Sequence, residues 1–196
     1  MTNLKLLLPV IFILNSCSTL DTSYFGYLKN YIQGNSIVIS NESMLNIKYS
    51  FIKISFGRSD AVLVLSSINE DEVFTWIGSN FEVVKTFKGI IVYSNIPNIH
   101  FDLPSFNIDF SFKQKYFSFF ANLYEPDLEH QIVNYELISR KESKDGYVNI
   151  YRKEMKSINW VVNEEFYLNN RGLVTKSIQY INPLKNKLVV NFYYQY

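Results

Sequence analysis

The sequence predicts an all-β protein: an antiparallel, curved meander sheet that forms a sandwich or an incomplete barrel, preceded by a short N-terminal helix. Three observations support this prediction. Apolar and polar residues alternate along most of the chain after residue 44, which is the pattern of strands buried on one face. Phe and Tyr are abundant, at 16 and 15 residues, and aromatic side chains favour pleated sheets over helices. Short turn sequences with Gly, Asn or Asp separate the alternating segments.

The first 16 residues have the layout of an export signal. Lys5 precedes an apolar stretch from Leu6 to Leu14, and small or polar residues follow this stretch directly. The stretch is too short to cross a bilayer as a helix, which takes about 20 apolar residues. We therefore expect residues 1–16 to be a signal peptide, with a buried core helix as the alternative.

Cys17 is the single cysteine of the chain and follows this segment directly. Leu14 stands three positions before it and the small Ser16 one position before it, which resembles a bacterial lipobox. The cysteine of that motif is acylated, and each buried methylene of an acyl chain contributes about 0.8 kcal/mol to membrane binding. Ser18 stands where an aspartate commonly retains such proteins in the inner membrane. We expect a lipid anchor in the outer membrane with the protein facing the periplasm; the alternative is an ordinary secreted protein with an incidental cysteine.

The rest of the chain divides into a linking segment and one domain. Residues 17–44 are expected to hold the lipidated cysteine, a helix over 18–35 and a connection, because apolar residues recur there at the spacing of one helical face. Residues 45–196 are expected to form a single β domain. Lys5 is the only charge in the signal, so the mature chain carries as many basic as acidic side chains. A neutral chain gives no reason to expect nucleic acid as a partner.

Alternation and turn residues locate the strands of the β domain. The parity of the alternation changes near Phe51, which indicates a bulge there or a strand buried on both faces. Pro97 and Pro104 predict a break over 95–105, and Pro126 predicts a second break. Residues 144–146 and 170–172 are hairpin-type turns. The predicted strands are 45–51, 52–56, 61–65, 73–77, 81–87, 90–94, 132–140, 147–152, 160–168, 173–180 and 188–194.

Trp76 and Trp160 occur in two similar stretches of the sequence. Each tryptophan is followed by a turn with a basic residue and a glycine, at 88–89 and at 171–172, and then by aliphatic residues. The stretches are either two related hairpin halves or the chance likeness of two strand–turn–strand segments. We expect both tryptophans to be mostly core residues; stacking on the face of a sugar is the alternative.

Few residues suggest catalysis. His100 and His130 are placed in the proline-containing connections and have no partner at the spacing of a metal site. Glu164 and Glu165 are adjacent in a strand, so their side chains point to opposite faces and cannot form a catalytic pair together. The acidic run at 70–72 lies between two strands and is expected to be a solvated turn. We therefore expect no enzymatic activity, no metal and no cofactor.

Two blocks of the sequence resemble a known family. The first runs from SFGRSDAVLVL through EVFTWIGSNFEVVKTFKGIIV, and the second is INWVVNEEFYLNNRGLVTKSIQY. Together with the lipobox, these blocks are similar to the YjbF/GfcB family of outer-membrane lipoproteins. The matching positions are Trp76, Gly89, Trp160, Phe166, Gly172, Ser177 and Gln179. The resemblance implies a mostly β fold and a role in capsule or exopolysaccharide secretion, and it supplies no catalytic residue.

Three functions fit these observations. The first is a non-enzymatic outer-membrane lipoprotein that supports capsule or exopolysaccharide assembly and secretion, by binding polysaccharide or a protein of the secretion machinery. The second is a periplasm-facing carrier or chaperone for lipid or other apolar ligands, which a stretch apolar on both faces, such as 44–56, would allow. The third is a polysaccharide-modifying enzyme.

We expect Cys17→Ser to abolish partition of the protein with outer membranes, because acyl chains on that sulfur would be its strong anchor. Labelling with radioactive palmitate measures the modification directly, and the wild type alone should take up label. If the wild type takes up none, the lipoprotein interpretation is wrong and the protein is an ordinary secreted one.

Overall fold

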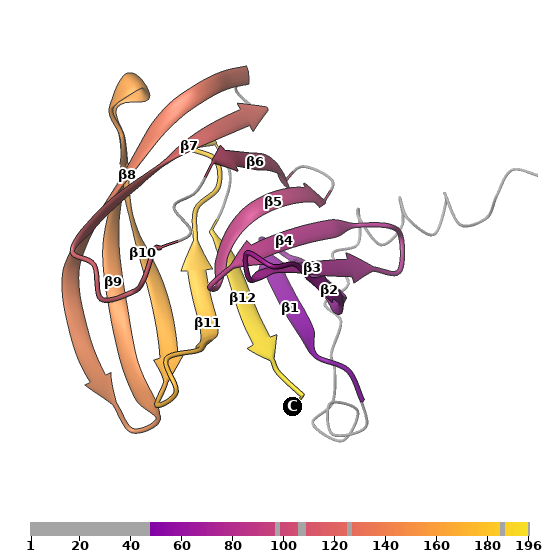
Figure 1. The fold of residues 1–196 in the computed structure, drawn as a ribbon. Coiled ribbons are helices and arrows are strands. Elements are labelled where there is room, and N and C mark those ends of the chain that lie inside the picture. The colour runs from indigo at the N-terminus through magenta and orange to yellow at the C-terminus, as the bar shows by residue number, and fades with distance from the viewer. Residues whose placement is uncertain (1–47, 97–98, 106–108, 125–126, 185–186, 196) are drawn as a thin grey trace, which may run out of the picture. The chain divides into compact units, whose positions relative to one another are not determined.

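The last strand of the chain pairs with the first and closes the sheet into a barrel (Figure 1). The computed structural model describes residues 48–96, 99–105, 109–124, 127–184 and 187–195, all within the unit Ile37–Tyr196. The expected signal peptide, Cys17 and the expected helix over 18–35 lie outside the described residues. The prediction of an all-β antiparallel meander is confirmed, and the barrel is closed, neither incomplete nor a sandwich.

Twelve strands follow one another around the barrel, each antiparallel to its neighbours in sequence. The closing pair β1–β12 is the exception to this sequential order, and its register runs from Phe51 opposite Tyr193 to Phe56 opposite Leu188. The strands are β1 (Phe51–Phe56), β2 (Ser59–Ile68), β3 (Val73–Gly78), β4 (Val83–Phe87), β5 (Ile90–Ile96), β6 (Ile99–Ser105), β7 (Tyr116–Tyr124), β8 (Asp127–Ser143), β9 (Gly146–Met155), β10 (Trp160–Asn169), β11 (Val174–Gln179) and β12 (Leu188–Tyr193). The short 3₁₀ helix η2 (Lys156–Ile158) joins β9 to β10.

Two strands lie where the sequence did not predict them. Strand β6 occupies most of the predicted break over 95–105, and Pro104 lies where the register between β6 and β7 shifts. Proline lacks an N–H group, so an irregular position of this kind is where a sheet tolerates it. Strand β7 lies in a stretch where the sequence predicts no strand, although its inward side chains Phe117, Phe119 and Ala121 alternate with outward ones. Strand β4, in contrast, begins only at Val83, two residues after the predicted start.

The change of parity near Phe51 marks the start of β1. Phe51 and Ile52 are both buried, although neighbouring side chains of a strand point to opposite faces. The Phe51 ring stacks on Tyr193 of β12, with 4.5 Å between the ring centroids. The strand is therefore buried on both faces here, and residues 48–50 are not part of a strand.

The two tryptophan stretches do not form equivalent hairpins. Trp76 is the fourth residue of β3, and its stretch continues through β4 to the turn at 88–89 and β5. Trp160 is the first residue of β10, and its stretch reaches the turn at 171–172 and β11 without an intervening strand.

The β4–β5 hairpin lies against the inner face of β11, so that opposite walls of the barrel touch. The buried amide of Gln179 on β11 makes this contact: its Oε1 accepts a hydrogen bond from Ile91 N at 3.0 Å, and its Nε2 donates to Gly89 O at 2.9 Å. The same Nε2 donates to Ser177 Oγ at 2.7 Å. Gly89, Ser177 and Gln179, three positions of the family resemblance, thus form one hydrogen-bonded contact.

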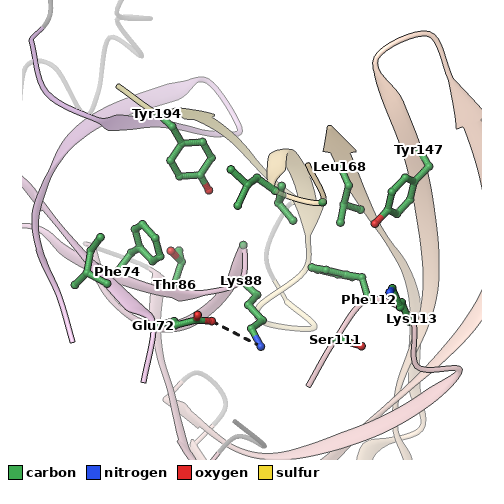
Figure 2. Close-up of a pocket in the computed structure, with 15 residues that line it drawn as sticks. Glu72, Phe74, Thr86, Lys88, Ser111, Phe112, Lys113, Tyr147, Leu168 and Tyr194 are labelled. Atoms are coloured by element: carbon green, nitrogen blue, oxygen red, sulfur yellow. Dashed lines mark ion pairs between the residues drawn. The ribbon is translucent and has the colours of Figure 1, made fainter. Parts of the chain in front are cut away.

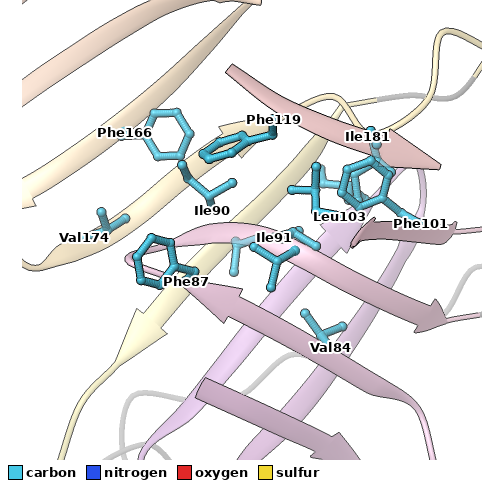
Figure 3. Packing of buried hydrophobic residues seen from close by; sticks show 14 of the residues in the cluster. Val84, Phe87, Ile90, Ile91, Phe101, Leu103, Phe119, Phe166, Val174 and Ile181 are labelled. Atoms are coloured by element: carbon cyan, nitrogen blue, oxygen red, sulfur yellow. The ribbon is translucent and has the colours of Figure 1, made fainter. Parts of the chain in front are cut away.

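Hydrophobic side chains from both walls fill the space around this contact (Figure 3). Phe87 and Ile90 flank the hairpin turn, and Phe166 and Val174 come from β10 and β11. A Cβ atom on Gly89 would lie 2.6 Å from Cβ of Val174, closer than such atoms approach. Gly89 therefore lets the two walls meet, and its φ of +84° is one that glycine adopts without strain.

We expect Gly89→Ala to lower the free energy of unfolding by several kcal/mol more than Gly172→Ala. Both glycines are in hairpin turns with left-handed φ, at +84° and +80°, so alanine costs about 1–2 kcal/mol at each from the backbone. Among the described residues, the single atom within 4 Å of a Cβ on Gly172 would be Tyr147 Oη at 3.8 Å, whereas a Cβ on Gly89 would clash with the Val174 side chain. Urea unfolding of both variants measures the difference, and equal losses would contradict the close wall-to-wall contact.

Candidate functional site

A pocket of about 500 Å³ opens at one end of the barrel. It lies among the turns β2–β3, β4–β5 and β10–β11, the start of β9, and the connection between β6 and β7 (Figure 2). Its walls are mainly apolar and come from six elements or turns: Ile68, Phe74, Phe112, Leu168, Leu173 and Val174. The volume falls in the range of small-molecule sites, about 300–1,000 Å³.

Two lysines and one glutamate are the charged residues in the part of the lining that the structure describes. Lys88 Nζ donates a hydrogen bond to Phe110 O at 2.8 Å and lies 3.8 Å from Glu72 Oε2. Figure 2 shows this ion pair with Phe74 and Thr86 on one side and Phe112 and Lys113 on the other. The side chain of Glu72 is 69% exposed and that of Lys88 is 32% exposed, so water reaches the pair.

Both members of this ion pair have an unusual backbone. Glu72 has φ of +60° and Lys88 has φ of +48°, in the left-handed region that Gly and Asn prefer. Lys88 and Gly89 together form the two-residue β4–β5 turn with positive φ at both positions, the geometry that most often holds Asn-Gly. Each turn therefore carries a charged side chain at a position where the backbone favours another residue.

The connection between β6 and β7 forms one wall of the pocket and is tied to β8 and β9. Phe112 O accepts hydrogen bonds from Asn149 Nδ2 at 3.0 Å, from Tyr151 Oη at 3.2 Å and from Arg140 Nη2. Tyr151 Oη also approaches Gln114 O at 3.1 Å. Burial raises the pKa of Tyr151 to about 12, although the positive charge of Arg140 and the Asn149 side chain oppose the shift.

A second charged pair lies inside the barrel, away from the pocket. Lys153 Nζ donates to Glu164 Oε1 at 2.9 Å, and both side chains are almost wholly buried. Glu164 Oε1 also accepts from Tyr180 N at 2.8 Å, and Lys153 Nζ donates to Tyr180 O, which fixes the chain just after β11. Burial raises the pKa of Tyr135 well above its usual value, and the charge of Glu164 adds to the shift. This pair connects β9, β10 and the chain after β11, and it is not part of the pocket.

The two tryptophans have different surroundings, and neither lines the pocket. Trp76 is fully buried, and its Nε1 donates to Thr86 Oγ1 at 2.8 Å. Trp160 is partly buried, and Lys153 Nζ lies 5.3 Å from its ring centroid. Thr86 does line the pocket, so Trp76 supports the wall from behind.

Both histidines lie on strands, so the prediction that they lie in connections is wrong. His100 is an exposed residue of β6 whose ring makes an edge contact with Tyr124 at 5.2 Å. His130 is an exposed residue of β8, and its backbone N donates to Asn122 Oδ1 at 2.9 Å. Within the described ranges, no three His, Cys, Asp or Glu residues are grouped closely enough to hold a metal ion. In the same ranges, no helix has the length and hydrophobicity needed to span a membrane.

Sequence reasoning missed Lys88 and Lys113 as site residues. Glu164 and Glu165 do lie on opposite faces, with Glu164 buried and Glu165 accepting a hydrogen bond from Tyr167 Oη at 2.6 Å. The run at 70–72 is an exposed turn, as predicted, but the carboxylate of Glu72 reaches the pocket. Lys88 precedes Gly89 in a two-residue turn, a position that more often holds Asn, and this unusual choice could have indicated a functional role for Lys88. The sequence around Lys113 has no comparable feature.

The fold of this chain is similar to that of a protein of known structure. No family model matches the chain, and no curated protein matches it in sequence. Among solved structures, the hypothetical lipoprotein YmcC from Escherichia coli (K12) superposes with a TM-score of 0.57 at 10% sequence identity. The match covers 85% of this chain and 93% of that chain. At this identity the likeness concerns the fold alone, and membership of the YjbF/GfcB family stays a prediction.

We expect Tyr151→Phe to lower the free energy of unfolding at pH 7 by about 1–3 kcal/mol, because Phe112 O and Gln114 O lose the single hydroxyl donor that lies within hydrogen-bond distance of both. The raised pKa means that the folded protein holds the phenolic proton more tightly than the unfolded chain does. The contribution of Tyr151 is therefore complete below about pH 10 and is lost as the pH rises towards about 12.

Urea unfolding at a series of pH values measures this dependence. The wild type should lose more stability above pH 10 than Tyr151→Phe does, and the exposed Tyr49→Phe control should behave as the wild type. An equal alkaline loss in the wild type and Tyr151→Phe would show that the hydroxyl does not secure the pocket wall.

Proposed function

We propose that this protein is a lipid-anchored outer-membrane protein that acts by binding, and that its pocket holds the apolar part of an amphiphile. The observation that carries the proposal is the pocket itself, with about 500 Å³ of space and mainly aliphatic and aromatic walls. Each methylene moved from water into such a site contributes about 0.8 kcal/mol, so one acyl chain would gain considerable binding free energy.

The chemistry of the walls favours an apolar ligand over a bare sugar. A glycan has hydroxyl groups on every side, and each buried hydroxyl group needs a hydrogen-bond partner in the protein. Among the residues that the structure describes, the lining includes no Asn, Gln, Asp or Arg, and Glu72 is its single carboxylate. The described part of the lining also includes no histidine, the commonest general base, which supports binding rather than catalysis as the role of the pocket.

The proposed location and process rest on the sequence. The junction from Leu14 to Cys17 supports a lipid anchor, and the similar fold of a protein described as a hypothetical lipoprotein agrees with it. The two blocks that resemble the YjbF/GfcB family support a role in capsule or exopolysaccharide secretion. A lipid anchor would confine the pocket to the membrane surface and so raise its effective concentration near the secretion machinery.

Photolabelling of the full chain in lipid nanodiscs tests the binding proposal. A long-chain alcohol that carries a diazirine on its chain should label the pocket, with adducts mapped by mass spectrometry to peptides around Leu168 and Leu173. We expect Leu173→Trp to reduce this labelling at least several-fold, because the indole would fill the pocket.

Val161→Trp is the matched control, since Val161 is an aliphatic residue of β10 with 44% exposure against 38% for Leu173, and it is not part of the lining. Its labelling should equal that of the wild type. Labelling that is spread evenly over the barrel surface and ignores Leu173→Trp would contradict a ligand in the pocket.

A further inference from the structure

We infer that Lys88 and Lys113 bind the anionic head of the pocket ligand, which makes that ligand a long-chain amphiphile ending in a carboxylate or a phosphate. The inference rests on the proposed function, because it assumes that the pocket holds an apolar chain. It adds the chemical class of the head group, for which the evidence is a separate set of residues at the same pocket.

The charge of the pocket differs from that of the chain as a whole. The mature chain is neutral, whereas the lining, as far as the described residues go, carries two lysines, one glutamate and no other ionised side chain. Lys88 comes from the β4–β5 turn and Lys113 from the connection between β6 and β7, so two lysines from separate segments line one pocket. A site with apolar walls and a local excess of positive charge is complementary to an amphiphilic anion.

The Lys88–Glu72 ion pair is one that a ligand anion can replace. Its 3.8 Å separation is at the long end for an ion pair, and the Glu72 carboxylate is mostly in water. Exposed pairs of this kind contribute little to stability because water screens them. A carboxylate or phosphate held by the apolar walls could therefore take the place of Glu72 beside Lys88, while Glu72 returns to solvent.

The hydrogen bond from Lys88 to Phe110 O holds the ammonium group beside the pocket. Phe110 is itself fixed in the core, where its ring is 4.3 Å from that of Phe117 and 6.4 Å from that of Phe87. The position of this charge is thus set by the core before any ligand arrives, which lowers the cost of ordering it on binding.

The turn that carries Lys88 allows a clean test of its charge. Because the two-residue turn geometry prefers Asn-Gly, Lys88→Asn removes the charge while keeping a residue suited to the positive φ. Lys113 is exposed, so Lys113→Asn removes the second charge without disturbing the core. Lys85→Asn is the matched control: Lys85 is exposed on β4, lies 5.5 Å from the Tyr93 ring centroid and is not part of the pocket.

The experiment compares three diazirine probes of equal chain length on the full chain in nanodiscs of uncharged lipid: a fatty acid, a monoacylglycerol phosphate and a fatty alcohol. At limiting probe concentration we expect the wild type to be labelled in the pocket about tenfold more by an anionic probe than by the alcohol. Lys88→Asn and Lys113→Asn should each reduce this ratio several-fold, and the double variant should bring it close to one. Lys85→Asn should leave the ratio unchanged.

The outcomes separate the head-group inference from the proposed function. Preference for either anionic probe alone supports the inference and identifies the head group, and preference for both supports an anionic head without choosing between carboxylate and phosphate. Equal labelling by all three probes, or a ratio that none of the pocket variants changes, overturns the inference and leaves apolar binding in place. If no probe labels the pocket at all, the proposed function itself is wrong. Should Lys88→Asn not fold, the exposed Lys113→Asn decides the result.

Discussion

The contact between Gln179 and the β4–β5 hairpin is the constraint on which the rest of the barrel depends. A closed barrel of about eight strands is just filled by its own side chains, and wider barrels leave space. Twelve strands would enclose more volume than inward side chains fill, unless the walls approach one another. Gln179 brings them together because its one buried amide makes hydrogen bonds with both Gly89 O and Ile91 N. Gly89 has no side chain, so the hairpin can approach Val174 closely.

The pocket is the part of the interior that this approach leaves open at one end. The connection between β6 and β7 enters the same space, and Asn149, Tyr151 and Arg140 hold its Phe112 carbonyl. The barrel is consequently packed in its middle and hollow at one end. The close approach of the two walls at Gly89 thus determines where the pocket lies, and a larger residue at Gly89 would alter both the contact and the pocket.

Two lysine–glutamate pairs in this barrel illustrate how burial decides the role of a charge. Lys153 and Glu164 are almost wholly buried at 2.9 Å, with the backbone of Tyr180 as a further partner, so removing either would leave an uncompensated charge in the core. Lys88 and Glu72 lie 3.8 Å apart and are open to water. The first pair is a fixed part of the fold, whereas water reaches both members of the second pair, which is why we propose that a ligand anion can replace Glu72 there.

The sequence by itself determined the fold class, most of the strands and their sequential pairing, because the period of two and the turn residues are local signals. It did not locate β6, whose Pro104 suggested a break, and it could not show that β1 pairs with β12, because that pairing joins residues far apart in the chain. The sequence could not predict the candidate site either, because its residues also lie far apart in the chain. Glu72, Lys88, Lys113 and Leu173 come from four separate turns or connections at the same end of the meander, and only the closure of the barrel brings them around one pocket.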